Sequence, residues 1–62
     1  MKREYTKQKA KTLLDRIKKY WASEGYLVEG KIEPIGYNAV MRETMYEIRT
    51  NLHNGLPTQR VG

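Results

Sequence analysis

The spacing of apolar residues changes at Gly25, and this change constrains the fold more than any other feature of the sequence. Between about Thr6 and Glu24, apolar side chains recur every three or four positions, the spacing of one helix face. After Gly25 they alternate with polar residues, which is typical of strands. The chain therefore reads as a helix followed by strands. The helical positions are Ala10, Leu13, Leu14, Ile17, Tyr20 and Trp21.

The ends of this predicted helix carry recognisable signals. Thr6 is the candidate N-cap, but Lys9 stands three residues later where a capping box needs Glu or Gln. Gly25 follows the last periodic residue, where a glycine can take positive φ and end the helix. We expect Tyr26 to fold back onto the apolar stripe, as in a Schellman motif.

Two strands follow. The first covers residues 27–33, and Pro34 either ends it or places it at a sheet edge. In the second strand one face is expected to meet the helix, and it carries Tyr46, Ile48, Thr50 and Leu52. The other face is expected to point outward, with Met45, Glu47, Arg49 and Asn51.

The connections leave alternatives open. Gly36 to Asn38 suggest a turn, and residues 39–41 fit either a short extra strand or a packed loop. Asn54 and Gly55 favour a type I′ turn, after which residues 56–61 fit either a third, edge strand or a frayed tail. The predicted fold class is α+β: one N-terminal amphipathic helix packed on a small antiparallel β-hairpin or three-stranded sheet, αββ or αβββ.

The chain has 62 residues and no cysteine. This length fits one domain, residues 1–62, with residues 1–5 and 57–62 as candidates for frayed ends. A domain this short has a thin core, and disulfide bonds or cysteine metal sites cannot reinforce it. Because one helix covers only one face of a hairpin, we expect two copies to form a homodimer by joining strand edges or stacking exposed faces.

The net charge of +5 is concentrated in the first third of the chain. Residues 1–19 hold eight cations and two carboxylates, whereas residues 20–62 hold four cations and five carboxylates. On a helical wheel the cations flank both sides of the apolar stripe, so they could follow a DNA or RNA phosphate backbone. The alternative is an ordinary solvated helix face. The candidate nucleic-acid-binding residues are Lys7, Lys9, Lys11, Arg16, Lys18 and Lys19.

The outer face and the ends of the hairpin most resemble a protein interface. Met, Tyr and Arg are enriched in interface cores, and the candidate residues here are Tyr37, Met41, Arg42, Met45 and Arg49. The leading hypothesis is a small non-enzymatic interaction module that self-associates through its hairpin, or binds another protein. Nucleic-acid binding through the basic helix is the alternative hypothesis.

We expect no catalytic residues, no metal site and no cofactor. His53 is the only histidine, and it lies at the predicted end of a strand. The sequence spacing of the Asp and Glu residues does not indicate that any two carboxylates converge. The longest apolar stretches are only a few residues, so neither a membrane span nor a signal peptide is expected. These features predict a cytoplasmic protein.

Overall fold

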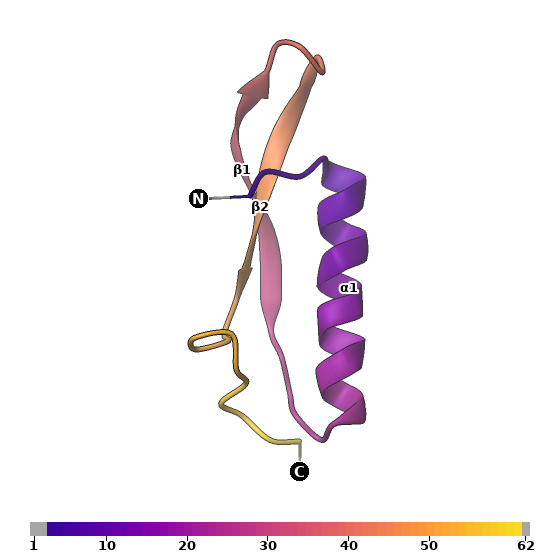
Figure 1. The fold of residues 1–62 in the computed structure, drawn as a ribbon, viewed down its shortest axis with the longest axis vertical. Coiled ribbons are helices and arrows are strands. Elements are labelled where there is room, and N and C mark those ends of the chain that lie inside the picture. The colour runs from indigo at the N-terminus through magenta and orange to yellow at the C-terminus, as the bar shows by residue number, and fades with distance from the viewer. Residues whose placement is uncertain (1–2, 62) are drawn as a thin grey trace.

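The computed structural model describes residues 3–61 and contains one helix and one antiparallel hairpin. Helix α1 spans Lys7–Ser23, strand β1 spans Gly30–Asn38 and strand β2 spans Glu43–Thr50. The helix lies along one side of the hairpin and contacts both strands (Figure 1). This arrangement confirms the predicted α+β class in its αββ form.

Both ends of α1 follow the sequence signals. The Thr6 side chain accepts a hydrogen bond from the Lys9 N–H at 3.3 Å, as an N-cap does. At the other end Gly25 has φ +89°, and its N–H donates to the Ala22 carbonyl. The Tyr26 N–H donates to the Trp21 carbonyl at 2.9 Å, which completes the predicted Schellman motif.

Strand β1 continues past Pro34, so Pro34 marks an edge strand rather than the end of a strand. Pro34 lies opposite Tyr46, and Tyr46 exchanges both of its backbone hydrogen bonds with Tyr5, at 2.9 and 2.7 Å. The backbone groups of Tyr46 thus point away from β1, and the ladder requires no N–H from Pro34. A bulge follows, since the register shifts between Pro34 and Gly36.

The connection between the strands is a loop and not an extra strand. Gly36 to Asn38, which the sequence suggested as a turn, belong to β1. The Asn38 side-chain oxygen accepts hydrogen bonds from the N–H groups of Val40 and Met41, at 2.9 and 3.1 Å. This Asx turn reverses the chain over residues 39–42, and the loop is not packed, because Val40 is 93% exposed.

The C-terminal segment folds back without forming a continuous strand. His53 and Leu56 exchange backbone hydrogen bonds around Asn54 and Gly55, which both have positive φ, as the predicted type I′ turn requires. Residues 59–61 then lie antiparallel to residues 25–27, and the Leu27 N–H donates to the Gln59 carbonyl at 2.9 Å. The segment therefore extends the hairpin toward the end of α1.

The core lies between α1 and the hairpin and is small. Among the described residues, the buried apolar side chains are Ala10, Leu14, Val28 and Met45. Gly30 allows close packing here, because a Cβ at this position would lie 2.7 Å from the Leu14 Cδ1 atom. The face of the hairpin that carries Gly30 and Thr50, which are paired across the strands, is thus the one that meets the helix, as predicted for Thr50.

Candidate interaction surfaces

The turn end of the hairpin carries an exposed apolar surface. It projects past the first turn of α1, so the helix does not cover it (Figure 1). Val40 is 93% exposed and Tyr37 is 67% exposed, although both are large apolar residues. We call this surface the apolar tip, and it comprises Ile35, Tyr37, Val40 and Met41.

The structure brings together three of the five residues that the sequence suggested for a protein interface. Tyr37, Met41 and Arg42 all lie at or beside the apolar tip and are exposed. Arg49 is also exposed, but it lies further along β2. Val40 and Ile35 were missed, because neither the loop that carries Val40 nor the bulge that carries Ile35 leaves a periodic signal in the sequence.

Met45 was predicted to be an exposed interface residue on the outward face, and this exposure is wrong, since only 6% of the residue is exposed. The N-terminal segment is responsible. Tyr5 pairs with Tyr46, next to Met45, and residues 3–6 line one hollow together with Met45. Because residues 1–5 were treated as a candidate frayed end, this cover was not foreseen. Met45 belongs to the core.

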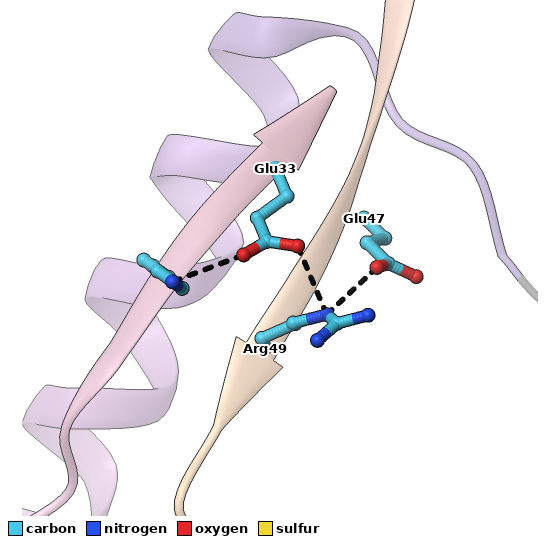
Figure 2. A network of polar contacts seen from close by, with 4 residues as sticks. Glu33, Glu47 and Arg49 are labelled. Atoms are coloured by element: carbon cyan, nitrogen blue, oxygen red, sulfur yellow. Dashed lines mark hydrogen bonds and ion pairs between the residues drawn. The ribbon is translucent and has the colours of Figure 1, made fainter. Parts of the chain in front are cut away.

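The outer face of the hairpin is covered by charges that neutralise one another. Lys31, Glu33, Glu47 and Arg49 alternate along the strands with the residues that face α1. Figure 2 shows Glu33 between two cations: its carboxylate lies 3.0 Å from the Lys31 Nζ atom and 3.1 Å from the Arg49 Nε atom. Arg49 Nε also lies 2.8 Å from Glu47. This face therefore has no net charge and few apolar groups.

These contacts shift two ionisation equilibria. The hydrogen bond from Lys31 lowers the pKa of the Glu33 carboxyl below its ordinary value, and the nearby charge of Arg49 lowers it further. The hydrogen bond to Glu47 raises the pKa of the Arg49 guanidinium, and the charge of Glu33 adds to this. Arg49 is exposed and Glu33 is only partly buried, so the network fixes side-chain geometry more than it stabilises the fold.

The cations of α1 remain on the solvent side of the helix. All six candidate nucleic-acid-binding residues are exposed. Lys19 lies 3.0 Å from Asp15, one turn away. Within residues 3–61 the other five form no ion pair. The sequence thus placed these side chains correctly, and their function stays a prediction.

An aromatic cluster lies at the C-terminal end of α1. The Trp21 ring packs edge-to-face on Tyr20, with ring centroids 4.9 Å apart, and on Tyr26 at 5.9 Å. The Arg60 guanidinium lies 5.6 Å from the Tyr26 ring centroid. Tyr20 is 58% exposed, so it is accessible to a ligand.

Neither the protein-family models, nor the curated proteins, nor the solved structures contain a match to this chain. No helix within residues 3–61 is long and apolar enough to cross a membrane. The same residues contain no group of three or more side chains suited to holding a metal ion. A cytoplasmic location stays a prediction.

Proposed function

We propose that this protein is a small, non-enzymatic interaction module that forms a homodimer through its apolar tip. The observation that carries the proposal is the large accessible surface area of the single chain. The most exposed apolar part of this surface lies at the tip. Tyr37, Met41 and Arg42 lie there, and these residue types are enriched in the cores of protein interfaces.

The accessible surface area of the chain supports the proposal that a partner covers part of it. Its accessible area is 5101 Å², whereas a compact monomer of 7.3 kDa exposes only about 4,200 Å². The excess, about 900 Å², is close to the roughly 800 Å² that each partner buries in a standard interface. The shape agrees, because the radius of gyration is 13.1 Å against about 10.5 Å for a compact chain of this length.

The apolar tip is a better contact surface than the outer face or the free edge of β1. The outer face consists of charges already paired with one another, and their desolvation would oppose association. Along the free edge, Pro34 offers no N–H at a position that points away from β2. The tip lacks both obstacles, and burying it removes apolar area from water.

Two matched substitutions test the proposal. Val40 and Val61 are both exposed valines, at 93% and 62%. Val40 lies in the turn between β1 and β2 and Val61 lies near the C-terminus, and Figure 1 shows these two parts of the chain at opposite ends of the molecule. We expect Val40→Lys to prevent dimer formation and Val61→Lys to leave it unchanged. Burying one valine contributes about 1.5 kcal/mol or more, and a symmetric dimer buries two, so the dissociation constant should rise about a hundredfold.

Sedimentation equilibrium from about 1 to 200 μM measures this constant for each variant. A monomeric unsubstituted protein over the whole range would refute the homodimer. A dimer that Val40→Lys and Val61→Lys weaken equally would refute the tip as its interface. Circular dichroism of both variants shows whether the monomer fold is kept.

A further inference from the structure

Two cations and an aromatic ring form a line along α1. Arg16 and Tyr20 follow Lys9 by seven and eleven positions, which places the three residues within an arc of about 40° on the helix surface. All three are exposed, and Tyr20 is the only exposed aromatic residue among the described residues of α1. We call this line the aromatic ridge.

A second line on the opposite border of the buried stripe carries charge without an aromatic ring. Lys7, Lys11 and Lys18 also fall within an arc of about 40° and are exposed. We call it the lysine ridge. The two ridges belong to one helix and differ in one chemical respect, which is the presence of Tyr20. This makes each ridge a control for the other.

Tyr20 is held in place while more than half of its surface stays open. Its ring meets the Trp21 ring at 4.9 Å with an interplanar angle of 78°, and Tyr20 is 58% exposed. An exposed, fixed aromatic ring beside cations is the arrangement by which proteins hold unpaired bases. Arg16 lies one helical turn before Tyr20, about 6 Å along the axis, so it can reach the phosphate of a base stacked on Tyr20.

We infer that the aromatic ridge binds single-stranded nucleic acid, with Tyr20 stacking on a base and with Arg16 and Lys9 contacting phosphates. The charge distribution favours a polyanion on this side of the molecule. The cations of the outer hairpin face are paired with carboxylates, whereas Lys9 and Arg16 form no ion pair within residues 3–61. A duplex is a poorer ligand, because its bases are stacked internally and leave Tyr20 without a partner.

The inference does not depend on the proposed homodimer. The apolar tip lies beyond the N-terminal end of α1, and Tyr20 lies near the other end of the helix (Figure 1). The two proposals therefore fail separately: substitutions in the aromatic ridge should change nucleic-acid binding and leave sedimentation unchanged.

Fluorescence anisotropy with labelled dT12, U12 and a duplex of the same length tests the inference between about 50 and 200 mM salt. Tyr20→Leu should weaken binding of the single strands about tenfold, and Tyr20→Phe, which keeps the ring, should preserve it. Duplex binding should change little in either variant. Circular dichroism confirms that each variant retains its helix.

The charge contribution has a matched control on the same helix. Lys9→Gln combined with Arg16→Gln removes two charges from the aromatic ridge, and Lys7→Gln combined with Lys18→Gln removes two from the lysine ridge. Only the first pair should lower the slope of log affinity against log salt, by about 1.4 for two phosphate contacts. Equal effects of the two pairs, unchanged binding by Tyr20→Leu, stronger binding of the duplex, or no binding of dT12 and U12 at the lowest salt would each overturn the inference.

Discussion

Gly30 sets how closely the helix packs on the hairpin, and replacing it with alanine tests this packing. A Cβ at position 30 would lie 2.7 Å from the Leu14 Cδ1 atom and 2.8 Å from the carbonyl oxygen of Arg49. The leucine methyl can move, but the carbonyl belongs to the paired strand, so relief requires the strands or the helix to shift. We therefore expect Gly30→Ala to destabilise the fold.

The sign of the change in stability distinguishes a closely packed Gly30 from a glycine at an unstrained position. In an unstrained position, Gly→Ala stabilises a protein by about 0.4–1 kcal/mol, because the unfolded chain has less freedom to lose. Overpacking costs about 1–3 kcal/mol, which leaves a net loss of about 1–2 kcal/mol. Domains of this size have a free energy of unfolding of roughly 3–9 kcal/mol, so the loss should lower Tm by about 5–15 °C.

Thermal melts followed by circular dichroism, at one fixed protein concentration, measure this shift. A double-mutant cycle with Leu14→Ala gives the internal control. Because the smaller side chain at position 14 leaves room for the new methyl group, the double variant should lose less stability than the two single losses added together. An unchanged or raised Tm in Gly30→Ala would refute the close packing between α1 and β1.

Three further outcomes are expected. Because the pKa of Glu33 is lowered, the contribution of its ion pairs to stability is present above the ordinary carboxyl pKa and is lost as pH falls through the lowered value. NMR titration should place this pKa below that of an isolated glutamate, and Lys31→Gln should raise it. Thr6→Ala should cost about 1 kcal/mol in denaturant unfolding, because the N-cap acceptor is lost. Met45→Ala should cost about 2 kcal/mol or more, whereas Met41→Ala, at a residue 51% exposed, should leave monomer stability nearly unchanged.

The parts of the fold that sequence predicted are those set by neighbouring residues. Thr6 and Gly25 act within one helical turn of the groups that they cap, and Asn54 and Gly55 form a turn through their own φ values. Alternation along the chain similarly fixed which face of the second strand meets the helix. Such local signals require no knowledge of distant partners.

The parts that sequence did not predict depend on residues far apart in the chain. Met45 is buried because the segment that contains Tyr5 runs beside β2, about forty positions away in sequence. Whether Pro34 ends a strand depends on the direction in which its partner Tyr46 points its backbone groups. Neither of these features has a periodic signature.

The two proposed surfaces lead to a combined prediction, because they lie at different ends of one elongated molecule. A homodimer joined at the apolar tips carries two aromatic ridges, and a strand that reaches both gains affinity through effective concentration. A strand that reaches one ridge gains nothing. We therefore expect Val40→Lys to weaken binding of a long oligonucleotide such as dT60 by tenfold or more, while binding of dT12 stays the same. If Val40→Lys weakened both equally, Val40 would contact the nucleic acid itself, and the tip would belong to the same surface as the ridge.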